Sequence, residues 1–271
     1  MAALAGLAAC GGASTGPDVG EQFMLDPITF TVNDNRLTFD PDAPDDLVEL
    51  NGVNVSRSTD PRVGDGSSAA RVLRGSTGYL TARANRVQTF AFYTAGDQFS
   101  ARGNYGGIYG RTTPYTLAAD TSASLTGRYA GMLIRDLGQS GVQGVHSTVS
   151  GDVELDIDLE GDGIDAMITN RIESRVGAPS RTLNLSDLTI TDANVANNGV
   201  FVGSLSGAST QVRSPLSDFA FLTTRPSNGV FEGVVGGRDG DDPEVTGVLG
   251  LEHLNTLGVT LYSERGVFYA E

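Results

Sequence analysis

Lysine and tryptophan are absent from this chain of 271 residues, and cysteine occurs only once. Arginine therefore supplies all 18 Lys+Arg positions, against 33 acidic residues, and the formal net charge is −15. Such an acidic balance argues against nucleic acid as a partner, because nucleic-acid interfaces are strongly positive. The single cysteine excludes an intramolecular disulfide.

Aromatic residues make up only 7% of the chain, whereas glycine occurs 36 times and proline 10 times. A composition rich in glycine and β-branched residues favours many short strands joined by turns and disfavours long helical bundles. The 39% of hydrophobic residues suffices for a core of ordinary size. The length is consistent with one or two domains, and we predict an all-β fold.

The amino-terminal residues indicate a signal that targets the protein for export. Residues 1–9 are uncharged and mostly apolar, and they lead into Cys10. This segment resembles the end of a bacterial lipoprotein signal peptide, with residues 7–10 matching the lipobox, whose cysteine thiol receives a diacylglyceryl group. The alternative is a free cysteine in an apolar tail. A complete signal peptide has a positively charged start and a longer apolar run, so we expect the signal to begin upstream of residue 1.

The residue after Cys10 is Gly11 rather than aspartate. By resemblance to sorted lipoproteins, this favours the outer membrane over the inner one. Residues 10–24 are rich in small and polar residues, which predicts a flexible tether. We therefore expect a lipid-anchored protein of the outer membrane, exposed on the cell surface.

Residues 25–118 are predicted to form a β-rich domain. Apolar residues alternate with threonine in 28–32 and return in 37–39 after an Asn-Asp-Asn turn, which is typical of a hairpin. A second hairpin is predicted around Asn51-Gly52, a favoured two-residue turn. Residues 56–70 and 114–124 lack a pattern and are expected to be loops.

Residues 119–271 carry a stronger strand signal. In residues 152–160, apolar residues alternate strictly with aspartate and glutamate, so one face should be core and the other water-facing. The predicted strands are 125–134, 152–160, 164–172, 183–192, 198–205, 217–223, 228–235, 244–251 and 264–270. We expect most of them to form one antiparallel sheet that closes on itself, with 264–270 pairing both near Leu125 and near Val248.

Five short motifs in this region, at residues 127–131, 151–159, 199–203, 229–233 and 266–269, resemble strands of the transferrin-binding protein B family of Gram-negative surface lipoproteins. The resemblance implies a C-terminal eight-stranded antiparallel β-barrel, here residues 119–271, preceded by a smaller β-rich handle-type domain, here residues 25–118. It also implies capture of an iron-bearing protein, haem or another nutrient ligand.

The sequence departs from the family pattern at two places. Glu232 replaces a usual tyrosine, and residues 237–244 replace the family's usual loop. The length leaves no room for a second lobe, so we expect one handle-type domain and one barrel. This makes host transferrin itself a doubtful ligand.

Catalytic and metal sites find little support. The two histidines, His146 and His253, lack a nucleophile-elbow motif, and with one cysteine they do not complete a zinc site. Residues 156–165 resemble a calcium loop superficially, but the twelfth position is Met167 rather than glutamate. The strand interpretation explains the same acids better, and the acidic turn 239–244 is interpreted as a solvated loop. We predict no enzyme activity, no metal and no cofactor.

The remaining candidate is a glycine-rich stretch that combines aromatic and basic residues. Its predicted ligand-binding residues are Arg102, Tyr105, Tyr109, Arg111 and Tyr115. Tyrosine can anchor an interface or ligate haem iron, and arginine pairs with carboxylates or propionates. The alternative is that these tyrosines pack the handle sheet against the barrel.

The sequence thus predicts a surface lipoprotein that binds an unidentified protein or haem-type ligand. One alternative is a structural or adhesive lipoprotein that uses the barrel as a scaffold, kept soluble by its charge. A third is a secreted hydrolase on a β scaffold.

Overall fold

The computed structural model describes most of the C-terminal half of the chain and several separate strands before it. The described residues are 18–21, 28–32, 35–40, 47–50, 53–54, 68–73, 77–83, 87–94, 104–111, 115–135, 144–161, 163–175, 178–214, 217–226, 229–237, 240 and 242–271. Every regular element in these ranges is a β-strand, as predicted. Within them, no helix is long and apolar enough to cross a membrane.

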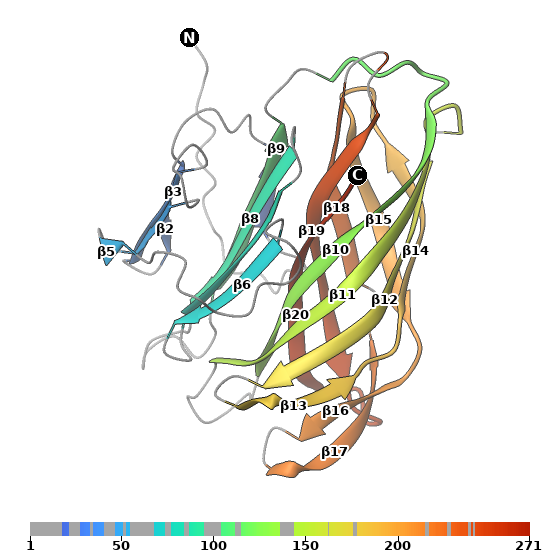
Figure 1. Cartoon of the computed structure of the whole chain (residues 1–271). Helices are drawn as coiled ribbons and strands as arrows, with labels where there is room; N and C mark the ends of the chain where they lie inside the picture. Colours follow the sequence, from blue (N-terminus) through green and yellow to red (C-terminus); the bar gives the residue numbers. More distant parts are fainter. Residues whose placement is uncertain are drawn as a thin grey trace.

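A closed barrel of antiparallel strands forms the larger part of the fold (Figure 1). Its strands, in order around the wall, are β10 (Ser122–Arg135), β11 (Gly144–Asp158), β12 (Gly163–Arg175), β14 (Leu188–Val195), β15 (Val200–Gly207), β18 (Gly229–Gly236), β19 (Glu244–Leu254) and β20 (Thr260–Ala270). Because the barrel is closed, each of these strands has a neighbouring strand on both sides within the ring. Closure is the usual way in which a twisted sheet of this size avoids exposed strand edges.

The last strand closes the barrel. Phe268 of β20 pairs with Tyr129 of β10, and Val267 pairs with Val248 of β19 on the other side. The sequence prediction for residues 264–270 is confirmed. The main chain continues this closure past the strand end, because Thr126 and Glu271 exchange hydrogen bonds of 3.3 and 3.0 Å.

The alternation of β11 is confirmed as well. Leu155 and Ile157 are each 2% exposed in the lumen, whereas Asp156 and Asp158 point outward into water. The period of two in a strand thus separates the core and the acidic face, as the sequence predicts.

Aromatic side chains fill one part of the lumen. The rings of Phe231 and Phe268 stack with centroids 4.4 Å apart, and Phe201 lies 5.3 Å from Phe231. Tyr129 crosses a pair of facing glycines, Gly131 and Gly266, where any Cβ would collide with the phenol ring. This close approach gives a physical reason for glycine at both motif positions.

A β-bulge in β12 changes which side chains face the lumen. Ile164 and Ile168 point inward, but Asn170 adopts a positive φ of 49° and the pairing with β11 shifts at this point. Beyond the bulge Arg171 and Glu173 are buried, and Ile172 is 37% exposed. The inserted residue therefore brings two charged side chains into the barrel.

Three further strands extend the barrel at one end, which we call the basal end (Figure 1). They are β13 (Ala178–Asn184), β16 (Thr210–Ser214) and β17 (Ser217–Pro226). The predicted strand 183–192 is divided between β13 and β14 by residues 185–187, and the predicted strand 217–223 lies in β17, outside the ring.

The N-terminal strands form two smaller sheets. The first has the order β1 (Asp18–Glu21), β9 (Asn104–Arg111), β8 (Val87–Thr94), β7 (Thr77–Arg83) and β6 (Ser68–Leu73), and the second contains β2 (Ile28–Val32), β3 (Asn35–Asp40), β4 (Leu47–Leu50) and β5 (Val53–Asn54). The predicted hairpins are present, since Phe30 pairs with Leu37 and Leu50 pairs with Val53.

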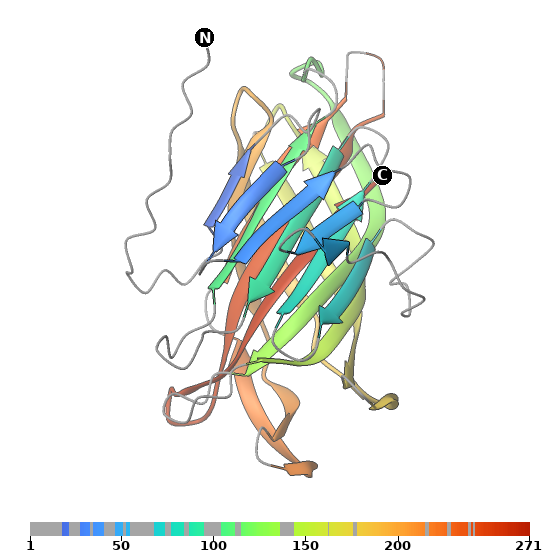
Figure 2. The same ribbon diagram turned by 90° about the vertical axis from the view of Figure 1, so that its left-hand side faces the viewer.

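The five-stranded sheet covers the outer face of β10, β19 and β20, as Figure 2 shows. Thr89 of β8 hydrogen-bonds Thr246 of β19 at 2.8 Å, and Thr246 in turn donates to the carbonyl of Phe268. Side chains on both faces of β19 and β20 are buried for this reason. A strand covered on both sides loses the simple alternation of core and surface.

Candidate ligand-binding site

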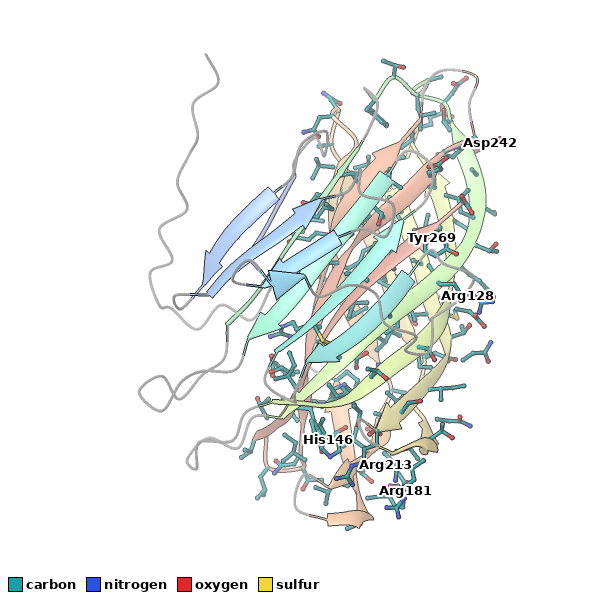
Figure 3. The ribbon with its side chains drawn as sticks, turned by 60° about the vertical axis from the view of Figure 1, so that its left-hand side comes forward. Arg128, His146, Arg181, Arg213, Asp242 and Tyr269 are labelled. Atoms are coloured by element: carbon teal, nitrogen blue, oxygen red, sulfur yellow. The ribbon has the colours of Figure 1, made fainter. Side chains whose placement is uncertain are left out.

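Four exposed apolar side chains lie at the basal end of the barrel, on two separate segments. Leu257 and Val259, in the turn between β19 and β20, are 84% and 55% exposed, and Phe221 of β17 is 48% exposed. Leu222 is the fourth member of this group. Figure 3 places His146, Arg181 and Arg213 at the same end and Asp242 at the opposite one.

The turn at residues 255–259, which we call the basal turn, is held in one conformation. The Asn255 carboxamide oxygen accepts hydrogen bonds from the main-chain N–H groups of Leu257 and Val259, each at 2.9 Å. Gly258 has a φ of 77°, a conformation that favours glycine. The sequence Asn-Thr-Leu-Gly-Val thus encodes a rigid turn that presents two apolar side chains to solvent.

Inside the barrel, near its basal end, a buried carboxylate accepts hydrogen bonds from side chains of several strands. Glu264 of β20 accepts hydrogen bonds from Tyr129 at 2.7 Å, from Arg171 at 2.6 Å and from His253 at 2.7 Å. The side chains of Arg171, His253 and Glu264 are all fully buried. The carboxylate therefore joins β10, β12, β19 and β20 inside the lumen.

The pKa values in this cluster follow from burial and neighbouring charge. Burial alone would raise the pKa of Glu264, but the Arg171 charge and the His253 hydrogen bond outweigh it and hold the pKa well below its usual range. Burial, followed by the charge of Glu264, raises the pKa of Tyr129 well above its usual value. At neutral pH the cluster thus contains a carboxylate and a neutral phenol.

A second buried group lies between the barrel wall and the β16–β17 hairpin. Glu173 accepts a hydrogen bond of 2.6 Å from Ser147, and Arg213 Nε of β16 lies 3.7 Å from the same carboxylate. Arg213 also donates to the carbonyl of Thr182, and its own carbonyl accepts from the Tyr262 hydroxyl at 2.9 Å. These contacts fix the hairpin on the barrel.

His146 completes this second group. Its Nδ1 lies 2.8 Å from the Ser147 hydroxyl, and its ring centroid is 5.2 Å from that of Tyr262. His253 also contacts the hairpin, with its Nδ1 3.4 Å from the hydroxyl of Thr224 of β17. Both histidines of the chain therefore support the packing of the basal end.

We expect Glu173 to make stability depend on pH. Burial raises the pKa of Glu173, against the lowering effects of Ser147 and Arg213. The folded protein then takes up this proton at higher pH than the unfolded chain, so the contribution of Glu173 to the unfolding free energy increases as the pH falls toward the ordinary glutamate value of 4.5.

Urea unfolding between about pH 7 and pH 5 measures this contribution. Glu173→Gln, which cannot titrate, should remove it and leave the rest of the pH profile unchanged. Glu154→Gln, at an exposed position of β11, serves as the control. Parallel pH profiles for wild type and Glu173→Gln would contradict the prediction.

Four of the five ligand-binding residues predicted from the sequence lie in the described part of the chain. Tyr109 of β9 is 4% exposed, and Tyr115 is half-buried and packs against the barrel core. Tyr105 and Arg111 lie near the two ends of β9, and their side chains are outside the part of the chain that the structure describes. Arg102 and Cys10 lie outside the described residues.

The basal turn and the buried charged groups were not predicted. Asn255 and Gly258 carry a readable turn signal, because asparagine caps such turns and glycine tolerates a positive φ. Arg171 and Glu173 carry none, since their inward direction depends on the bulge at Asn170. In the described residues, no group of three or more histidine, cysteine or acidic side chains is placed to hold a metal.

No protein-family model and no curated protein sequence matches the chain. Solved structures do match, and transferrin binding protein B from Haemophilus parasuis Hp5 has a TM-score of 0.46 at 10% identity, with 90% of this chain and 44% of that chain covered. A surface lipoprotein covers 91% of this chain and 96% of its own, with a TM-score of 0.34 at 11% identity.

The N-lobe domain of lactoferrin binding protein B from Moraxella bovis matches with a TM-score of 0.32 at 12% identity, over 71% of this chain and 78% of that domain. The chain spans less than half the length of the Haemophilus parasuis protein. Transferrin and lactoferrin binding proteins B are thus among the solved structures that match this chain.

Proposed function

We propose that this protein is a lipid-anchored lipoprotein of the outer membrane that binds a protein ligand at its basal end and catalyses no reaction. The lipobox at residues 7–10 supports the anchor, and the motifs of the barrel strands support a ligand-binding role. The barrel serves as the rigid scaffold. A structural or adhesive coat protein is the alternative that the experiments below distinguish.

The observation that carries the proposal is that side chains occupy the barrel lumen. Phe201, Phe231 and Phe268 fill one part, and the cluster around Glu264 fills the part nearer the basal end. A haem or similar small molecule would have to displace this core. A ligand is therefore bound on an outer surface, which suits a protein better than haem.

The basal turn is the surface best prepared for such binding. Leu257 and Val259 are held outward by the hydrogen bonds of Asn255, so little conformational entropy is lost when a partner covers them. Exposed apolar side chains on a rigid support are typical of protein interaction sites. The sequence-based prediction of Arg102, Tyr105 and Arg111 as ligand contacts is separate from the basal turn and stays a prediction.

Binding of the Cys10→Ala protein to immobilised transferrin, lactoferrin and haem tests the function. The first two probes are the proteins for which the compared binding proteins are named. We expect a protein probe to bind and Leu257→Ser/Val259→Ser to weaken binding at least tenfold, with an unchanged melting temperature. Val202→Ser, at a residue 53% exposed on the barrel side, is the matched control. Binding of haem alone would contradict a protein ligand, and binding of no probe would favour the scaffold alternative.

The lipid anchor is tested separately. A thioether-linked diacyl chain together with an amide-linked acyl chain gives stable membrane attachment, because two anchoring signals suffice. In a cell carrying the complete signal peptide, Cys10→Ala should move the protein from the membrane fraction to the soluble fraction. Membrane partitioning equal to that of the wild type would contradict the lipobox interpretation.

A further inference from the structure

In the part of the chain that the structure describes, one edge of β17 lacks a neighbouring strand over most of its length. Residues 210–214 of β16 pair with β17 on one side, whereas β19 pairs with it on the other side only at Arg225 and Pro226. Among the described residues, no strand pairs with residues 217–224 on that second side. The main-chain groups there can accept another strand.

The side chains along this edge are apolar and exposed. Phe221 and Leu222, which lie on opposite faces of the strand, are 48% and 37% exposed, and Ala220 and Thr223 are exposed as well. Natural proteins usually protect an edge with charges, proline or a bulge. Between residues 218 and 224 the only charge is Asp218, and Pro226 falls in the part that pairs with β19. The irregularity in the pairing with β16 is confined to residues 218–220, so residues 221–224 form a regular strand edge.

The hairpin extends beyond the barrel at the basal end, as Figures 1 and 2 both show. The edge is therefore displaced from the barrel wall, on the side from which a second hairpin of the same kind would approach. The Arg213 guanidinium lies 5.7 Å from the centroid of the Phe221 ring, which steadies this side chain on the hairpin.

We propose that two copies of this chain form a dimer in which their β17 edges pair antiparallel across a two-fold axis at Phe221. In an antiparallel ladder, hydrogen-bonded and non-hydrogen-bonded residue pairs alternate, so a two-fold axis cannot lie between two neighbouring pairs. The axis must therefore pass through a pair of identical residues, one from each copy. An axis at Phe221 uses residues 218–224 of each copy and stops before Arg225, where β19 already occupies the edge.

The register is favourable for the residues that it places opposite one another. Phe221 faces its counterpart, Ala220 faces Leu222, Phe219 faces Thr223 and Asp218 faces Thr224 in the second copy. Aromatic and aliphatic cross-strand pairs stabilise a sheet, and like charges placed opposite one another destabilise it. No like charges meet here, although each chain carries a net charge of −15.

Disulfide trapping tests this geometry directly, because Cys10 is the only cysteine of the chain. In the Cys10→Ala background, Phe221→Cys should form a covalent dimer rapidly under mild oxidation. Gln211→Cys, exposed on β16 of the same hairpin, is the matched control and should remain monomeric. Equal cross-linking of the two variants would overturn the proposed pairing.

Sedimentation equilibrium of the Cys10→Ala protein gives the second test. We expect a concentration-dependent dimer, and we expect Phe221→Lys to raise its dissociation constant at least tenfold, because two ammonium groups would then face each other. The melting temperature of the Phe221→Lys monomer should match that of the wild-type monomer. A protein that stays monomeric at every concentration, or a dimer that Phe221→Lys leaves intact, would overturn the inference.

Discussion

Deletion of residues 265–271 is expected to unfold the barrel. The deletion removes most of β20, which pairs with β10 on one side and with β19 on the other. It opens two strand edges at once and removes the buried side chains of Val267 and Phe268. The cost should be about 5 kcal/mol or more, a large share of the roughly 5–15 kcal/mol that stabilises a domain.

Circular dichroism during thermal unfolding, together with size-exclusion chromatography, measures this effect. We expect a lost or strongly lowered transition and aggregation through the exposed edges. Deletion of residues 11–17 removes the same length of chain from the predicted tether and should leave the transition unchanged. A 265–271 deletion that keeps the wild-type melting temperature would show that closure contributes little to stability.

Glu264→Gln is expected to destabilise the protein by about 3–5 kcal/mol, the usual cost of removing one partner of a buried ion pair. The substitution preserves the shape of the side chain but leaves the fully buried Arg171 guanidinium without its counter-charge. It also weakens the hydrogen bonds that Tyr129 and His253 donate to the carboxylate. Urea unfolding at neutral pH measures the loss.

Two controls separate the charge from the packing. The double variant Arg171→Met/Glu264→Leu removes both charges and should be far less destabilised than Glu264→Gln, since buried pairs replaced by apolar residues often cost little. Asp152→Asn, at the partner of Arg128 in an exposed ion pair, should cost about 1 kcal/mol or less. A loss below about 1 kcal/mol for Glu264→Gln would mean that Arg171 finds another partner or water.

The candidate site was less predictable than the barrel. Both histidines could be considered from the sequence only as catalytic or zinc-binding residues, whereas they lie beside Glu264 and Ser147 in the basal packing. The predicted tyrosine and arginine stretch forms β9, and its Tyr109 is buried. The basal turn was missed, although Asn255 and Gly258 could have indicated it.

Local alternation determined most of the barrel from the sequence alone. In β11 every apolar residue from Val153 to Ile157 faces the core and every acid faces water, because successive side chains of a strand point to opposite sides. The apolar content of residues 264–270 likewise required a partner on each side, and closure supplied both. These features depend only on neighbouring residues and on the need to bury apolar surface.

The tertiary structure decided the features in which that alternation fails. The bulge at Asn170 reverses the direction of every later side chain in β12, so Arg171 and Glu173 enter the lumen and Ile172 leaves it. The five-stranded sheet buries the outer faces of β19 and β20, so that side chains on both faces of these strands are covered. In both cases the direction and burial of a side chain depend on segments far away in the chain. The alternation of residues within one strand carries no information about those segments.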